Sequence, residues 1–317
     1  MKKEVYNLEF PSWCEEITIF GYHFTRVDDY RDRLVSLQHS ITATVHAEFK
    51  VRPSAGNNAV TAYVNLPERE EKSVLKHRGS ENTALSDILL LLSIFTSRDV
   101  FTVDNAGSAG KYRIFIADSR VYHWGRGLRL SIPYKNEAIP DDEPYGYDIG
   151  FEEGLNQVYA LIRSKDWQHK YDKGHYLVLA NMAFRCQPLE TTFIQCWTIW
   201  EHLFTLHNKR WLSDEQITRL NPAEKIAFLL VEYALKGEIN KSEKERINSL
   251  AKIRNRLVHF GHFPESGSVY DDAVLFIRLT EFIIAKTLGL EPSNFFNTIE
   301  GLEDFLKHKS ESKRGKP

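Results

Sequence analysis

Cysteine is scarce in this chain of 317 residues, and the three present follow no disulfide or metal-binding pattern. Cys14, Cys186 and Cys196 are odd in number, and their spacing fits no zinc motif. We therefore expect reduced, mostly buried thiols, as in cytoplasmic proteins. A disulfide-stabilised secreted domain is excluded.

Long apolar runs are also lacking. The longest, Ile88–Phe95, is interrupted by Ser93 and is far shorter than the roughly 20 residues that span a bilayer. The first residues, Met-Lys-Lys-Glu-Val-Tyr, do not contain the apolar stretch of a secretory signal. We expect a cytoplasmic protein with no membrane partner.

A strong excess of one charge is missing too, because the formal net charge is only -2. Any nucleic-acid site must therefore come from local charge. Residues 236–262 have such a local excess, with seven Lys/Arg against three acidic residues. This segment would attract phosphate, although solvated helix faces often carry similar charge. The apolar fraction of 42% is enough for a sizeable core.

Motifs for metals and nucleotides are absent. His202 and His207 stand five residues apart, which is not the i,i+4 spacing of two metal ligands on one helix face. The Gly-containing segment 105–112 begins with Asn105 and has Tyr112 after its lysine, so it reads as a turn and not as a phosphate loop. We expect no metal and no cofactor.

The N-terminal part is predicted to be rich in strands. Residues 42–51 alternate strictly between apolar and polar, which is typical of a half-buried strand. A Pro/Gly/Asn turn at 53–58 and a β-branched run at 60–66 complete a hairpin pattern. Residues 111–117 and 128–132 are further predicted strands.

One helix is expected within this part, over residues 83–97. It is largely apolar and is therefore predicted to be buried, with Ser80 and Asn82 as candidate N-terminal caps.

A linker is predicted at 135–146, where two prolines accompany an acidic cluster. Beyond it we predict helices near 149–171, 174–186, 189–208, 222–236, 242–260, 270–288 and 300–307. The predicted fold class is α+β: a β-rich N-terminal domain over 1–140, an all-α helical bundle over 148–308, and a basic disordered tail over 309–317.

The most specific feature is the run Arg254-Asn255-Arg256-Leu257-Val258-His259. We predict that it lies on the last turns of a helix with a capping box at Ser242–Glu245 and a left-handed glycine cap at Gly261. The predicted apolar stripe of this helix consists of Ile247, Leu250, Ala251, Leu257 and Val258.

Arg254 falls in the middle of that stripe, where a guanidinium is unfavourable unless it is paired or lines a polar pocket. Asn255 and His259 share one face, whereas Arg254 and His259 are about 140° apart on an ideal helix. Cooperation between Arg254 and His259 then needs a curled arginine side chain, a distorted last turn, or two copies of the helix.

These residue types suit the cleavage of RNA, which carries its own nucleophile in the 2′-hydroxyl. A histidine can give or take a proton near neutral pH. An arginine can hold the phosphate and stabilise the extra charge of the transition state. An asparagine can orient either group.

The run resembles the signature of HEPN-domain ribonucleases, and its surroundings are similar to the ApeA-like branch of that family. The resemblance covers roughly residues 150–290 and is most specific at 254–259. It implies a homodimer with a composite, metal-independent endoribonuclease site that cleaves RNA, acting as an antiphage (abortive infection) or toxin effector. The segment Thr198–Phe204 is similar to the family helix that carries an acidic residue, which implies a third participant, Glu201.

The candidate catalytic residues are therefore Arg254, His259, Asn255 and Glu201, and the candidate substrate-binding residues are Arg256, His262 and Lys252. A second register, Arg256 with His262, also fits the loose spacing of the family, but an apolar residue follows its arginine. The alternative function is a non-catalytic HEPN-like module that binds a nucleotide, RNA or a protein. The N-terminal domain is expected to bind a regulatory or trigger partner.

Overall fold

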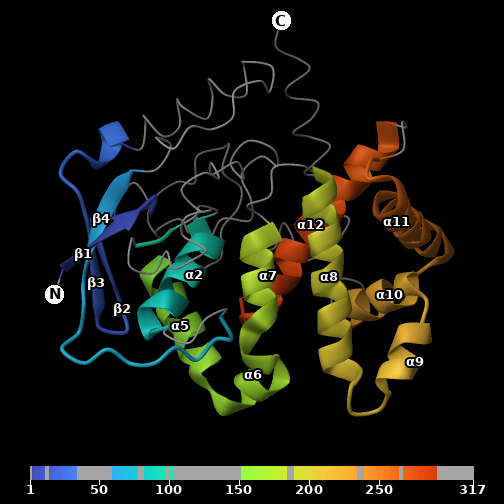
Figure 1. The fold of residues 1–317 in the computed structure, drawn as a ribbon, viewed down its shortest axis with the longest axis horizontal. Coiled ribbons are helices and arrows are strands. Elements are labelled where there is room, and N and C mark those ends of the chain that lie inside the picture. Colours follow the sequence, from blue (N-terminus) through green and yellow to red (C-terminus); the bar gives the residue numbers. More distant parts are fainter. Residues whose placement is uncertain are drawn as a thin grey trace, which may run out of the picture. The chain divides into compact units, whose positions relative to one another are not determined.

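The computed structural model describes residues 2–10, 14–33, 59–77, 82–96, 100–102, 151–183, 189–233, 239–263 and 267–290. It is a mixed α+β fold with a small antiparallel sheet near the N-terminus and a mostly helical remainder (Figure 1). The described residues group into two compact units. The N-terminal unit comprises those of 1–132 and 149–187, and the C-terminal unit those from 188 onward.

Four strands form the sheet of the N-terminal unit. They are β1 (Lys2–Tyr6), β2 (Glu16–Ile19), β3 (Tyr22–Arg26) and β4 (Val60–Asn65), in the order β1-β4-β3-β2 with every pair antiparallel. Strands β2 and β3 form a hairpin whose two turn residues, Phe20 and Gly21, both have positive φ. Such a turn matches the right-handed twist of the strands.

The predicted strand at 60–66 is confirmed as β4, but its hairpin partner at 42–51 lies outside the described residues, as do the predicted strands at 111–117 and 128–132. Within the described residues β4 pairs with β1 and β3. Both of these pairings are non-local, so the alternation within one run could not reveal them.

The predicted buried helix is confirmed as α2 (Ala84–Thr96), and nearly all of its side chains are buried. It begins after Thr83, so the candidate cap Asn82 lies one residue too early. The backbone N–H of Thr83 donates to the Ser86 hydroxyl at 3.3 Å, and the Thr83 hydroxyl donates to Glu70 at 2.6 Å.

The helix predicted over 149–171 is divided. Helix α5 (Phe151–Arg163) stops before Ser164, whose hydroxyl accepts from the backbone N–H of Trp167 and so caps a new helix, α6 (Lys165–Lys170). A short helical turn, η2 (Asp172–Gly174), has positive φ at all three of its residues and leads into α7 (His175–Ala183).

These helices belong to the same unit as the sheet. The Asn156 side chain on α5 accepts from the backbone N–H of Phe20 at 3.1 Å and donates to the carbonyl of Thr18 at 2.8 Å, so α5 is fixed to the β2–β3 hairpin. This grouping differs from the predicted division, in which the helical domain begins at 148.

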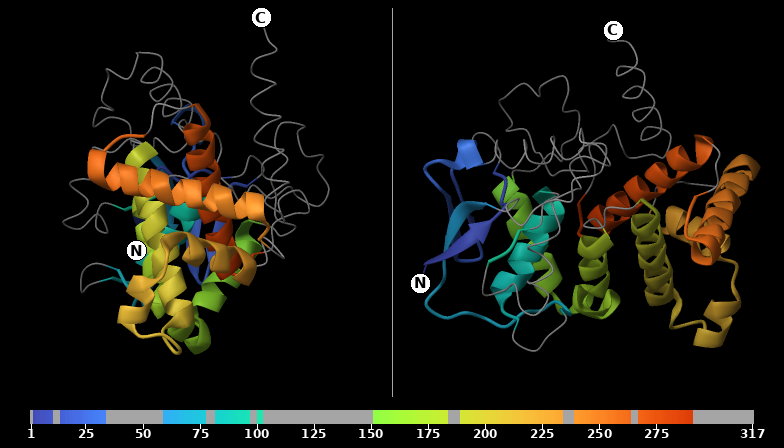
Figure 2. Two further views of the ribbon diagram at one scale, coloured as in Figure 1. Left: turned by 90° about the vertical axis from the view of Figure 1, so that its right-hand side faces the viewer. Right: turned by 45° about the horizontal axis from the view of Figure 1, so that its top comes forward.

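The C-terminal unit contains α8 (Leu189–Asn208), α9 (Asp214–Arg219), α10 (Pro222–Glu232), α11 (Lys241–Phe260) and α12 (Gly267–Thr287). Helix α8 contacts α10, α11 and α12, and α11 lies across it (Figure 2). The bounds predicted for α8 agree with those observed. Helix α9 was not predicted, because six residues are too few to show a helical period.

Buried aromatic rings form the core of this unit. Trp197 and Trp200 on α8 contact Phe276 on α12 at centroid distances of 5.3 and 5.2 Å, and the Trp200 indole donates to Thr280 at 2.8 Å. Along the described parts of the chain, no helix combines the length and apolar character needed to cross a membrane.

Candidate functional site

The candidate site lies at the C-terminal end of α11. A capping box starts this helix two residues earlier than predicted: Asn240 accepts from the backbone N–H of Glu243, and the Glu243 carboxylate accepts from that of Asn240. The prediction of Ser242–Glu245 is therefore wrong. The predicted left-handed cap is confirmed, since Gly261 has a φ of 75° and donates to Leu257 at 2.9 Å.

The packed face of α11 is also rotated from the predicted one. Its buried residues are Ile247, Leu250, Ile253 and Leu257. Val258, predicted to belong to this face, is 55% exposed. The centre of the buried stripe thus moves toward Ile253, and Arg254 lies toward its edge, partly exposed. A guanidinium at such an edge can keep its charged end in water, so it does not need a buried partner.

Arg254 and Asn255 are brought together. The guanidinium donates through Nη1 to the Asn255 side-chain oxygen at 3.1 Å. This bond turns the amide oxygen toward the arginine and leaves the amide NH₂ as a donor for another group. The arginine keeps its remaining N–H donors, since guanidinium has five.

His259 stands apart from this pair. It is exposed in the last turn of α11, and its ring meets the edge of Phe260 at a centroid distance of 6.3 Å. Within the described part of the chain, the imidazole makes no hydrogen bond or ion pair, with Arg254 or otherwise. One copy of the helix therefore presents the arginine and the histidine in different directions, as expected from their angular separation.

Glu201, the candidate third participant, is bound elsewhere. Its carboxylate accepts a hydrogen bond at 3.1 Å from the indole of Trp197, one turn earlier on α8, and Trp197 is almost fully buried. The described residues show no hydrogen bond or ion pair between Glu201 and either Arg254 or His259. In this structure the carboxylate satisfies a buried donor that would otherwise lack an acceptor.

The position of Glu201 along α8 is consistent with this separation. Phe193 contacts Phe263, just beyond the end of α11, at a centroid distance of 6.1 Å. The start of α8 therefore lies beside the end of α11. Glu201 is two turns further on, about 12 Å along the helix axis.

The candidate substrate-binding residues surround the end of α11. The Arg256 guanidinium lies 5.5 Å from the centre of the Phe260 ring, so the cation and the ring stack on the exposed side of the helix. His262 Nδ1 donates to the carbonyl of Phe263 at 2.9 Å, which leaves Nε2 as the nitrogen available to a ligand. Lys252 is exposed two turns before His259.

Apolar side chains are exposed at the same place. Val258 and Phe260, the neighbours of His259, are 55% and 67% exposed. The end of α11 therefore presents a mixed surface of imidazole, guanidinium and apolar groups. We call Lys252, Arg254, Asn255, Arg256, Val258, His259 and Phe260 the α11 surface.

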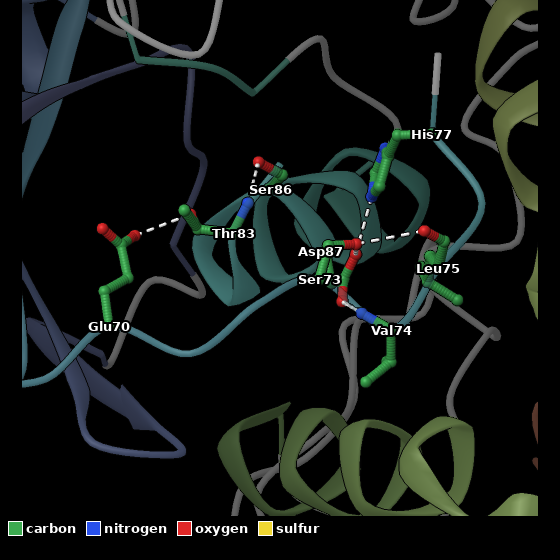
Figure 3. A network of polar contacts seen from close by, with 8 residues as sticks. All are labelled: Glu70, Ser73, Val74, Leu75, His77, Thr83, Ser86 and Asp87. Carbon is green, nitrogen blue, oxygen red and sulfur yellow. Dashed lines mark hydrogen bonds and ion pairs between the residues drawn. The ribbon is translucent and has the colours of Figure 1, made fainter. Parts of the chain in front are cut away.

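A different histidine, in the N-terminal unit, was missed by the sequence analysis. His77 Nε2 lies 2.6 Å from a carboxylate oxygen of Asp87, which is completely buried within α2 (Figure 3). The same carboxylate accepts from the Ser73 hydroxyl at 2.6 Å and from the backbone N–H of Val74 at 2.8 Å. Since a carboxylate only accepts, Nε2 carries the proton and Nδ1 faces away from the pair. In the sequence, the sign of this network is Asp87, a single acidic residue inside an otherwise apolar helix.

Two buried tyrosines lie in the same unit. Burial raises the pKa of Tyr22, and the nearby carboxylate of Glu70 adds to this effect. Burial also raises the pKa of Tyr159 to about 12, although the guanidinium of Arg163 opposes the shift. Within the described residues the Tyr22 hydroxyl has no hydrogen-bond partner.

Among the described residues, no three His, Cys, Asp or Glu side chains gather closely enough to hold a metal ion. The α11 surface itself offers imidazole, guanidinium and amide groups. Comparisons of the chain with protein-family models, with curated proteins and with solved structures found no match.

Proposed function

We propose that this protein is a metal-independent endoribonuclease of HEPN type, acting as an antiphage (abortive infection) or toxin effector. The observation that carries the proposal is the α11 surface. There an exposed imidazole, a guanidinium fixed to an amide, and further cations occupy the last turns of one helix. These groups supply proton transfer and phosphate binding without a metal.

The proposed reaction uses the 2′-hydroxyl of the RNA. Its oxygen attacks the adjacent phosphorus, the bond to the 5′-oxygen breaks, and a cyclic phosphate and a 5′-hydroxyl result. His259 transfers the proton, and Arg254 stabilises the negative charge that develops on the phosphoryl oxygens. Asn255 orients the guanidinium, and Arg256, His262 and Lys252 hold the flanking phosphates.

We propose that two copies of the chain complete the site. Arg254 and His259 of one copy make no contact, so the arginine of one copy would act with the histidine of the other. The exposed Val258 and Phe260 support this arrangement, because a partner copy would remove their apolar surface from water. A twofold axis beside α11 would create two equal sites.

The first experiment measures cleavage of a labelled RNA in the presence of EDTA. Wild-type protein is expected to cleave, whereas His259→Ala should lose about 10²- to 10⁴-fold in rate, as expected for a general acid or base. Val231→Ala, an exposed apolar substitution on α10, is the matched control and should cleave normally. Cleavage that requires added metal, or an unimpaired His259→Ala variant, contradicts the mechanism.

The second experiment tests the composite site by mixing two inactive variants. In a mixed dimer of Arg254→Ala and His259→Ala, one site keeps both wild-type groups if each site draws them from different copies. Half of the dimers are mixed after random exchange, so about a quarter of the wild-type activity should return. If each copy supplied its own pair, no activity would return.

A second candidate function is a non-catalytic module that binds RNA, a nucleotide or a protein at the same surface. It is favoured by the hydrogen bond between Glu201 and Trp197, which engages the proposed third participant away from the site. Under this alternative Arg254→Ala abolishes binding, and no condition yields cleaved ends.

A further inference from the structure

Trp211 is the most exposed of the large apolar side chains in the described residues, at 81% of its surface. It lies between the end of α8 and the start of α9. Figure 1 shows this turn at the lower end of α8. An indole left almost wholly in water contributes little to the packing of its own unit. The fold therefore does not explain why a tryptophan occupies this position.

The turn that carries Trp211 is rigidly built. The backbone N–H groups of Trp211 and Leu212 both donate to the carbonyl of Asn208, at 2.9 and 3.0 Å, and the Asn208 side chain donates to Phe204 at 2.9 Å. On the other side, Ser213 begins α9 with a complete capping box. The backbone below the indole is thus bonded to the last residue of α8 and followed by the capped start of α9, so little loop ordering would oppose binding.

Basic residues precede the indole in the chain. Lys209 and Arg210 directly precede Trp211 and are exposed. On α9, Glu215 pairs with Arg219. An exposed aromatic ring that follows an exposed lysine is suited to an anionic ligand with a flat ring.

We propose that Trp211, with the exposed Lys209 that precedes it, is a stacking platform for a base of single-stranded RNA. Stacking on an aromatic ring accepts every base, and adjacent cations attract the phosphate backbone. This inference rests on the proposed function for the identity of its ligand. It adds a second contact region for the RNA, at the opposite end of α8 from the α11 surface.

The distance between the two regions determines the RNA length needed. The start of α8 lies beside the end of α11, and Trp211 follows the last residue of α8. The 20 residues of α8 extend over about 30 Å. At about 3.4 Å for each stacked nucleotide, an RNA strand needs roughly nine nucleotides to reach from one region to the other.

The binding experiment uses the His259→Ala protein and a labelled single-stranded 20-nucleotide RNA of mixed sequence. Adding Trp211→Ala should raise Kd about 5- to 150-fold, which corresponds to the loss of one stacked base. Trp211→Phe should retain part of the affinity because it keeps an aromatic face. Val231→Ala, exposed but without flanking cations, should bind like the parent. Equal affinity of the Trp211→Ala variant overturns the inference.

The cleavage experiment separates this inference from the proposed function. In protein with an intact His259, Trp211→Ala should reduce kcat/KM for the 20-nucleotide RNA but leave that for a hexamer unchanged, because a hexamer is too short to reach both regions. If no protein cleaves RNA but Trp211→Ala still weakens binding, the ribonuclease proposal fails and the stacking platform stands. If wild type cleaves RNA and Trp211→Ala binds and cleaves it equally well, the ribonuclease proposal stands and the stacking platform fails.

Folding is checked by circular dichroism and thermal unfolding, and Trp211→Ala should match wild type because the indole is exposed. A partner protein is the competing use of such a side chain, since tryptophan is common in binding hot spots. If Trp211→Ala changes the oligomeric state by light scattering and leaves RNA affinity intact, the surface is a protein interface and the inference is overturned.

Discussion

His77 in the N-terminal unit and His259 in the C-terminal unit place the same side chain in opposite surroundings. His77 is 13% exposed and is held by the buried carboxylate of Asp87 at 2.6 Å. His259 is exposed and contacts the edge of Phe260. The bond to Asp87 fixes the orientation and the tautomer of the first imidazole. Within the described residues, no hydrogen bond fixes either property of the second.

The difference separates a structural histidine from one able to meet a substrate. The network around His77 fastens residues 73–77 to α2, and each member has a defined partner. A histidine that transfers protons to a large substrate must instead be reachable, and its orientation can come from the substrate or from a second copy of the chain. Under the proposed function, the histidine that acts on RNA is thus the one that its own chain leaves unfixed.

The largest expected effect on stability follows from removing Asp87. Asp87→Ala leaves the Val74 N–H and the His77 ring without their acceptor, so it should lower the free energy of unfolding by about 3–5 kcal/mol. The Ser73 hydroxyl keeps its second acceptor, the carbonyl of Leu75. His259→Ala should change it by less than about 0.5 kcal/mol, because the ring is exposed. Urea unfolding of both variants measures the difference. Equal losses would mean that the two histidines do not differ as described.

A smaller effect is expected at Glu201, and it tests which role this residue has. Glu201→Ala leaves the buried Trp197 indole without an acceptor, which should cost about 1–3 kcal/mol. Glu201→Gln keeps an acceptor oxygen and should restore most of that stability. If Glu201→Gln is stable yet fails to cleave RNA, the carboxylate charge acts in the reaction, and its bond to Trp197 would have to break in the proposed dimer. Normal cleavage limits Glu201 to its structural role.

The smallest effect is expected at Tyr22. Its buried hydroxyl has no partner among the described residues, so Tyr22→Phe loses no described hydrogen bond and should leave stability at pH 7 unchanged or slightly raised. The variant should differ at alkaline pH. Burial raises the folded-state pKa of Tyr22 above its ordinary value of about 10, so the unfolded state ionises first.

The free energy of unfolding of wild type should therefore fall as the pH rises above about 10. Tyr159, with a pKa raised to about 12, contributes in the same direction. Tyr22→Phe should show a shallower fall, and the double variant with Tyr159→Phe a shallower one still. Urea unfolding at pH 7, 10 and 11 measures these slopes. Identical slopes would mean that folding does not raise the pKa of the buried tyrosine hydroxyls.

Helices whose apolar residues recur at helical spacing could be predicted from the sequence. The bounds of α8 and the glycine cap of α11 were predicted, because apolar spacing and cap residues are local signals. The start of α11 was misplaced by two residues, since both Asn240 and Ser242 precede a suitably spaced glutamate and only packing decides between them. Pairings such as β1 with β4 depend on residues far apart in the sequence.

The contacts among the candidate site residues could be foreseen only in part, and their roles stay predictions. The structure brings Arg254 and Asn255 together, as adjacent residues on one helix allow. Sequence alone could not show that Glu201 would bind Trp197, because a helix wheel gives a side chain several neighbours and burial selects one of them. The His77–Asp87 pair was missed because two residues in different elements meet only after folding.

Gly174 links the geometry of His77 to a helical segment much later in the chain. A Cβ atom at this position would lie 2.7 Å from the Trp167 ring and 2.9 Å from Leu75, and the glycine also has a φ of +68°. The backbone N–H of Lys76 donates to the carbonyl of Lys173, so the two segments are joined at this point. Because Gly174 has no Cβ atom, residues 75–76 and residues 173–174 can approach each other this closely. A side chain at residue 174 would therefore displace Leu75 and, with it, the imidazole of His77 two residues later. Substitutions at residues 172–174 are thus expected to disturb the pairing of His77 with Asp87.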